Sequence, residues 1–127
     1  MGMDLTLYPH KEKIQHWRSM VGSSYLRLDR EYDLFAQIDR SVMGNEGGDV
    51  KQVCKPKSLP PNVEFMAYND EGLKETRTDK YGEGLTYVEA WELKKVKLHE
   101  ESTDWNKAIF AMIKALPDAY PVVLMWS

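Results

Sequence analysis

This chain contains little cysteine and no long apolar run, and each of these absences excludes a class of protein. Cys54 is the single cysteine among 127 residues, so no intramolecular disulfide is possible and a disulfide-stapled secreted scaffold is excluded. No apolar run approaches the roughly 20 residues that cross a bilayer, and the N-terminus lacks the basic then apolar pattern of a signal peptide. We therefore expect a cytoplasmic protein with no membrane partner.

The chain also lacks a strong excess of charge of either sign. Its 20 acidic residues are interleaved with 17 lysines and arginines, which leaves a net charge of −3. This balance argues against a surface that follows nucleic-acid phosphates, although a local basic patch is compatible with it. Nucleic acid is therefore an unexpected partner. The length and the 43% hydrophobic content suffice for one core, so a single domain over residues 1–127 is expected.

Signatures of metal and phosphate chemistry are missing as well. His10 and His16 are six residues apart, a spacing that does not set two imidazoles on one face of a helix. The sequence GNEGG at residues 44–48 lacks the lysine or helix that follows the glycines of a phosphate-binding loop. We predict no metal, no cofactor and no catalytic residue.

The single thiol leaves one catalytic alternative open. Lys55 and Lys57 follow Cys54 closely and would favour its thiolate, so a catalytic pair with His16 or His99 is conceivable. An incidental free thiol in a surface loop is the commoner situation, and we favour it.

Apolar periodicity predicts the elements of an α+β fold. Strands are expected at residues 3–9, 25–28, 63–68 and 122–125, and the last has no polar alternation, which is typical of a strand covered on both faces. Helices are expected after an N-cap at Asp29, after a capping box of Thr86 and Glu89, and along residues 105–116 up to Pro117. Together they predict a small sheet formed by the N-terminal strands and a buried C-terminal strand, packed by about three helices.

The remaining segments are predicted to be irregular. Residues 10–22 indicate a loop with one turn of helix, and residues 41–61 a flexible surface loop rich in glycine and proline. Core faces are expected on two of the helices. Their residues are Leu34, Phe35 and Ile38 on the first, and Trp105, Ala108, Ile109, Met112, Ile113 and Leu116 on the last.

One predicted turn carries three candidate binding residues. Arg77, Lys80 and Tyr81 precede the helix expected at Thr86, and a basic turn beside a helix N-terminus suits an anion such as a nucleotide phosphate. The competing and favoured interpretation is a turn made by Gly82 and Gly84 with solvated charges. Lysines also gather at the end of that expected helix, at residues 94, 95 and 97, with His99 beyond them.

The tryptophans divide between core and surface. Trp91, Trp105 and Trp126 fall in expected elements and are predicted to be buried. Trp17, between His16 and Arg18 in the irregular segment, is a candidate interface anchor.

Four blocks of sequence carry a resemblance to a known family. They are DLTLYP at residues 4–9, LDREYDLFAQI at 28–38, YGEGLTYVEAWELKKV at 81–96 and NKAIFAMIKALPDAYPVVLMW at 106–126. The chain resembles an uncharacterised family of small tailed-bacteriophage proteins, which share a D-L-T-L opening strand, a Y-G-x-x-L-T-Y-V block and an L-P-x-x-x-P-V-V-L closing strand. The likeness spans most of the chain and is weakest over residues 41–58. It implies a phage gene product in the host cell cytoplasm, and it implies no chemistry.

Two classes of function follow. The first is a small phage-encoded, non-catalytic binding protein that engages a host or viral protein through its irregular segments, with host takeover or anti-defence as a specific version. The second is a nucleotide- or phosphate-binding protein or small enzyme that uses Arg77, Lys80 and Tyr81. Single-stranded nucleic acid binding is a weaker third hypothesis, because the net charge opposes it.

Overall fold

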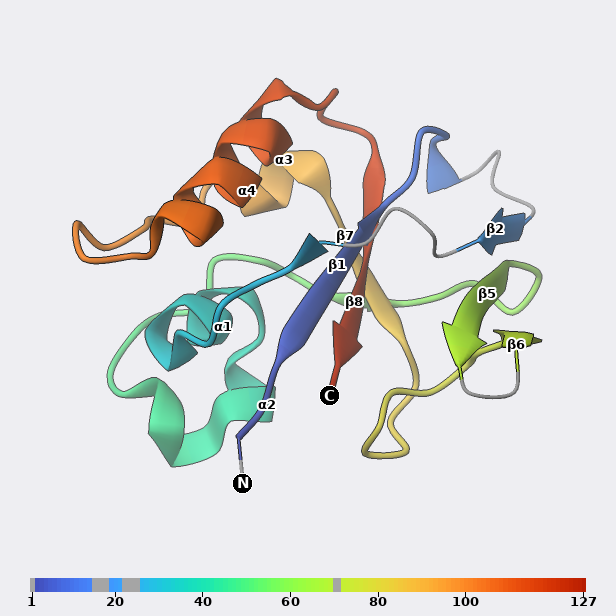
Figure 1. The fold of residues 1–127 in the computed structure, drawn as a ribbon, viewed down its shortest axis with the longest axis horizontal. Helices are drawn as coiled ribbons and strands as arrows, with labels where there is room; N and C mark the ends of the chain where they lie inside the picture. The colour runs from blue at the N-terminus through green and yellow to red at the C-terminus, as the bar shows by residue number, and fades with distance from the viewer. Residues whose placement is uncertain (1, 15–18, 22–25, 70–71) are drawn as a thin grey trace.

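Five antiparallel strands form the main sheet of the protein, in the order β3-β1-β8-β7-β4 (Figure 1). The protein is seen in a computed structural model that describes residues 2–14, 19–21, 26–69 and 72–127. A second sheet has the order β2-β5-β6, with β2 parallel and β6 antiparallel to β5. The strands are β1 (Leu5–Pro9), β2 (Ser19–Val21), β3 (Leu26–Arg27), β4 (Lys57–Ser58), β5 (Glu64–Asn69), β6 (Gly72–Glu75), β7 (Thr86–Glu89) and β8 (Pro121–Trp126).

The helices are short apart from the last one, and with the two sheets they confirm the α+β class. They are α1 (Tyr32–Ile38), α2 (Arg40–Met43), the 3-10 helix η2 (Gly44–Gly47), α3 (Ala90–Leu93) and α4 (Asp104–Ala115). Within the described ranges, none of them has the length and apolar character needed to cross a membrane.

The C-terminal strand β8 lies at the centre of the main sheet, as its continuous apolar sequence predicts. It pairs with β1 on one side, where Leu7 faces Leu124, and with β7 on the other, where Val88 faces Val122. The chain ends meet, because the Asp4 N–H donates to the Ser127 carbonyl over 2.7 Å and the Ser127 N–H donates back over 2.9 Å. Of the two N-terminal strands in this sheet, only β1 adjoins β8, because β3 pairs only with β1.

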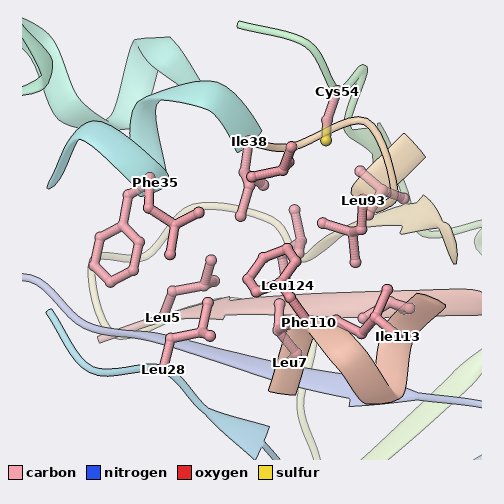
Figure 2. Packing of buried hydrophobic residues seen from close by; sticks show 14 of the residues in the cluster. Leu5, Leu7, Leu28, Phe35, Ile38, Cys54, Leu93, Phe110, Ile113 and Leu124 are labelled. Carbon is pink, nitrogen blue, oxygen red and sulfur yellow. The ribbon is translucent and has the colours of Figure 1, made fainter. Parts of the chain in front are cut away.

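Each face of the main sheet carries its own hydrophobic cluster. Side chains from α1, α3 and α4 pack with alternate residues of β1 and β8 on one face (Figure 2). In that view Phe35 of α1 and Phe110 of α4 point toward Leu5, Leu7 and Leu124 of the sheet. The opposite face packs against β5 through a smaller cluster, whose buried residues are Val63, Phe65, Leu85, Tyr87 and Val123. Residues 122–125 are therefore covered on both faces.

The prediction that a helix starts at Thr86 is wrong. Residues Thr86–Glu89 form β7, whose Tyr87 and Val88 are buried on opposite faces of the sheet. The capping box lies one element later, where the Glu89 side chain caps the Glu92 N–H and the Glu92 side chain accepts from the Glu89 N–H. The pairs Thr86 with Glu89 and Glu89 with Glu92 both have the three-residue spacing of a capping box. The helix starts at the second pair because residues Thr86–Glu89 pair with β8 as a strand.

The segments expected to be irregular contain elements of their own. Residues 41–61 include most of α2, all of η2 and β4, and residues 10–22 include β2. The polar stretch after residue 72 begins with β6. Asp29 is not an N-cap, because α1 begins after Glu31 and the backbone of Asp29 bonds to Asn106 instead.

The core face of α4 is only partly as predicted. Ile109 and Ile113 are buried, but Asn106 and Phe110 complete the buried face. Trp105 and Met112 lie at the edge of that face, and they expose 53% and 42% of their surface. Trp91 on the single-turn α3 is also exposed, at 40%, whereas Trp126 is buried as predicted.

Candidate functional site

The candidate residues before β3 lie outside the described residues. His16, Trp17 and Arg18 fall in the range 15–18, so their predicted role as an interface remains a sequence-based hypothesis. Arg77, Lys80 and Tyr81 are described, and the structure assigns each a different environment.

Arg77 is engaged in holding the chain together. Its guanidinium donates to the backbone carbonyls of Val63 and Pro61, and it lies 3.8 Å from the carboxylate of Glu75. These contacts fasten the segment after β6 to the start of β5. They use two of the five N–H donors of the guanidinium, and β7 stands where the helix dipole was expected.

Lys80 and Tyr81 lie on a tight turn closed by a bridge between Thr78 and Gly84. Asp79 organises this turn, because its Oδ1 accepts from the N–H groups of Tyr81 and Glu83 over 2.8 and 3.1 Å. Gly82 has a φ of 83°, which an L residue adopts only with strain. The favoured interpretation of a glycine turn therefore agrees with the geometry at Gly82.

The turn borders a cleft of about 570 Å³, which we call the acidic cleft. Asp39, Asp79 and Glu83 line it together with Tyr81 and Trp126, and its described lining contains no lysine or arginine. Three carboxylates with no basic partner are unfavourable for a phosphate. Among the described residues, no group of three or more His, Cys, Asp or Glu side chains is arranged to hold a metal ion.

Cys54 is a core residue rather than an activated surface thiol. Only 2% of its surface is exposed, and it packs with the helix-side cluster, where Figure 2 shows its sulfur. Burial, and secondarily the nearby Glu92 carboxylate, raises the pKa of the Cys54 thiol to about 12. Desolvation therefore outweighs the influence of the nearby lysines, which leaves the catalytic alternative without support. His99 lies instead beside Asp33, at 3.7 Å.

A second concave region lies between α4 and the segment that follows α3, and we call it the lysine groove. Four lysines line it: Lys94, Lys95, Lys97 and Lys114. Its apolar lining consists of Val96, Leu98 and Phe110, its volume is about 710 Å³, and none of the described residues that line it is acidic. The groove is therefore basic in a protein whose net charge is −3.

The lysines of the groove differ in how far their charges are compensated. Lys94 Nζ lies 2.6 Å from both the Leu116 carbonyl and the Asp118 carboxylate. The Lys95 ammonium lies over the ring of Trp91, 4.5 Å from its centroid. Lys97 and Lys114 are exposed, and within the described part of the chain neither ammonium has a partner.

Backbone contacts hold the groove in place. Gln37 of α1 accepts from the Lys97 N–H over 2.9 Å and donates to the Lys97 carbonyl over 2.8 Å. On the other wall, Lys107 Nζ donates to the Glu100 carbonyl over 2.9 Å, which ties α4 to the loop before it. The sequence shows the lysine cluster at residues 94–97, but Lys114 joins it only through the packing of α3 on α4.

A flank of α4 outside the groove carries two large exposed side chains. Trp105 and Met112 are seven residues apart, which places them on one side of the helix two turns apart. The Trp105 indole N–H donates to the Arg27 carbonyl over 2.7 Å, so its ring is held in one orientation. We call this pair the α4 flank, and the prediction from helical spacing that both residues belong to the core is wrong.

No protein-family model, curated protein or solved structure matches this chain.

Proposed function

We propose that the protein is a small, non-catalytic binding protein of a phage that engages another protein, of the host or the virus, in the host cytoplasm. The α4 flank is the observation that carries the proposal. Trp105 exposes 53% of its surface and Met112 42%, on a helix whose adjoining face is anchored in the core. Aromatic residues and methionine are enriched at the centres of protein interfaces.

The rigidity of the flank supports the same function. Trp105 is fixed by its hydrogen bond to Arg27, and α4 is packed on the sheet through Ile109, Phe110 and Ile113. A large side chain that is already ordered loses little conformational entropy when a partner covers it. An exposed tryptophan that the fold itself holds in place is therefore well suited to anchor a partner.

The alternative of a phosphate ligand at Arg77, Lys80 and Tyr81 has less support. Arg77 already donates to two backbone carbonyls, and the cleft beside Tyr81 is lined by three carboxylates. A thermal-shift screen with nucleotides and inorganic phosphate tests this alternative directly, because a ligand at 100 times its Kd adds about 2.7 kcal/mol to the native state. We expect no stabilisation.

The decisive experiment compares variants in cross-linking capture from the host lysate. Tagged wild-type protein is compared with Trp105→Ala/Met112→Ala and with Leu73→Ala, a matched control that removes an equally exposed apolar side chain from β6. A further variant, Trp17→Ala/Arg18→Ala, tests the interface predicted from sequence. The captured protein is then purified and its Kd measured against each variant.

We expect one stoichiometric partner that binds wild type and Leu73→Ala alike and binds the α4 flank variant at least tenfold more weakly. A partner lost only with the Trp17→Ala/Arg18→Ala variant would move the interface to that segment. Absence of any stoichiometric partner, together with stabilisation by a nucleotide, would contradict the proposal.

A further inference from the structure

The lysine groove provides a second, chemically distinct surface, which lies on the other side of α4 from the α4 flank. We infer that it receives an acidic segment of the partner protein, one in which aspartates or glutamates flank an apolar side chain. This inference rests on the proposed function and adds the chemistry of the partner to it.

Charge is the first argument. The whole chain carries three more acidic than basic side chains, yet the groove is lined by four lysines and no carboxylate. Asp118 compensates Lys94 alone, whereas the ammonium groups of Lys97 and Lys114 have no partner among the described residues. Two uncompensated charges on facing walls suit a ligand with more than one carboxylate.

The lining of the groove is the second argument. Val96 and Phe110 form a nearly buried floor, and Leu98 is half-buried above it. A basic rim around an apolar floor matches an acidic peptide with an apolar anchor better than a small inorganic anion. The volume of about 710 Å³ accommodates a few residues of such a segment.

The third argument is that the walls are preorganised. Gln37 clamps the backbone of Lys97 through two hydrogen bonds, and Lys94 is fixed to the end of α4 by the Leu116 carbonyl. Because the backbone of the groove is already ordered, binding of a ligand does not carry the entropy cost of ordering it.

An acidic protein segment fits these observations better than a nucleic acid. A nucleic-acid strand would extend beyond the groove over a protein of net charge −3, which repels it. Base stacking needs an open aromatic ring, whereas Phe110, the one aromatic side chain among the described lining residues, is nearly buried.

The test uses fluorescence anisotropy with defined probes and the full chain. The probes are a fluorescein-labelled peptide in which glutamates flank leucine and phenylalanine, the same peptide with lysines in place of the glutamates, and an oligothymidine of 20 nucleotides. The variants are Lys97→Glu/Lys114→Glu and a control, Lys57→Glu/Lys80→Glu, which reverses two exposed lysines outside the groove. Both double variants have the same net charge, and urea midpoints establish that both are folded.

We expect the glutamate peptide to bind wild type and the Lys57→Glu/Lys80→Glu control with similar Kd, and Lys97→Glu/Lys114→Glu at least tenfold more weakly. Its affinity should fall with salt, and amide chemical shifts should move within residues 94–98 and 107–114. Equal affinities for the two double variants, or no binding to wild type, would overturn the inference. Tighter binding of the oligothymidine that depends on Lys97 and Lys114 would overturn it in favour of nucleic acid.

The same variants separate this inference from the proposed function. A captured partner that requires Trp105 and Met112 but binds Lys97→Glu/Lys114→Glu normally would leave the proposed function standing and remove the acidic segment from it. Binding of the glutamate peptide in the groove, without any captured partner, would support the groove chemistry and contradict the proposed function.

Discussion

Asn106 of α4 joins that helix to the backbone of Asp29, which lies 77 residues earlier in the chain. Its Oδ1 accepts from the Asp29 N–H over 2.7 Å, and its Nδ2 donates to the Asp29 carbonyl over 3.0 Å. The same Nδ2 donates to the Glu31 carboxylate over 2.6 Å. The Asn106 side chain is fully buried. Its amide satisfies the N–H and the carbonyl of Asp29, which lies between β3 and α1 and belongs to neither element.

Replacing Asn106 should destabilise the fold more than any surface change. In Asn106→Ala the Asp29 N–H and carbonyl lose their partner at a partly buried site, and we expect the free energy of unfolding to fall by about 1 to 3 kcal/mol. Urea denaturation followed by circular dichroism measures the loss. Glu31→Gln is the control, because its amide oxygen can still accept from Asn106, and it should cost less than about 1 kcal/mol. If both variants lost the same free energy of unfolding, the hydrogen bonds between Asn106 and Asp29 would not be the main stabilising contribution of Asn106.

Glu92 links α3 to the segment before β4. Its buried carboxylate accepts from the Lys55 N–H over 2.8 Å and from the Glu89 N–H over 2.8 Å. Glu92→Gln turns one oxygen into an NH₂ group that faces a donor, so we expect a loss of about 1 to 3 kcal/mol in urea denaturation. Glu89→Ala removes only the reciprocal helix cap and should cost about 1 kcal/mol. A Glu92→Gln variant as stable as wild type would show that these amides find other partners.

Strong local patterns predicted part of this fold. The alternation of Leu5 and Leu7 and the continuous apolar run of β8 were sufficient, because a strand buried on one or two faces imposes that pattern directly. The start of α3 was misplaced because Thr86 and Glu89 carry the same spacing as Glu89 and Glu92. Only pairing with β8, far along the chain, distinguishes the two.

The candidate site depends even more on contacts that sequence does not show. Trp105 and Met112 have helical spacing consistent with a core position, and their exposure follows from the rotation of α4 that buries Asn106 and Phe110. Lysines flank Cys54 in the sequence, but in the fold its side chain packs in the hydrophobic cluster of buried residues, and this burial determines its pKa. Three lysines of the groove are visible as a cluster, whereas Lys114 is added by tertiary packing.

Burial of the Cys54 thiol should make it unreactive in the native state. Because its pKa is raised to about 12, alkylation by iodoacetamide at pH 8 should be at least 100-fold slower in native protein than in 6 M urea, a rough estimate from the loss of both thiolate and access. Mass spectrometry after timed quenching measures both rates. Native and unfolded rates within a factor of three would show that the thiol is accessible.

The same thiol predicts a loss of stability at high pH. Its folded pKa lies above the ordinary value of 9.0, so its contribution is complete below pH 9 and is lost as the pH rises toward 12. The difference in free energy of unfolding between wild type and Cys54→Ala isolates this contribution from the titration of lysines and tyrosines. That difference should be constant from pH 6 to pH 8 and should fall above pH 9. A constant difference up to pH 11 would contradict the raised pKa.

Asp4 predicts a small effect of the opposite sign at low pH. Its hydrogen bond with Arg30, and then that with Arg27, lowers the pKa of the Asp4 carboxyl below 3.8. Its contribution is therefore present above pH 3.8 and is lost as the pH falls through the folded pKa. Asp4→Asn should lower the urea midpoint slightly at pH 7 and not at pH 2, because exposed ion pairs contribute little. An equal difference at both pH values would assign the effect to something other than the charge.

Trp105 allows its exposure and its structural role to be measured separately. Trp105→Phe keeps an aromatic ring on the α4 flank but removes the hydrogen bond to the Arg27 carbonyl, so we expect a loss of about 0.5 to 1.5 kcal/mol. Since more than half of the Trp105 surface is exposed, the variant should also lose a large part of the fluorescence that iodide quenches. Trp126→Phe is the control, because Trp126 is buried and its removal should leave the quenchable fraction unchanged or raised. Quenching that is unaffected by Trp105→Phe would mean that the indole is covered in solution, and the α4 flank would then no longer qualify as a free binding surface.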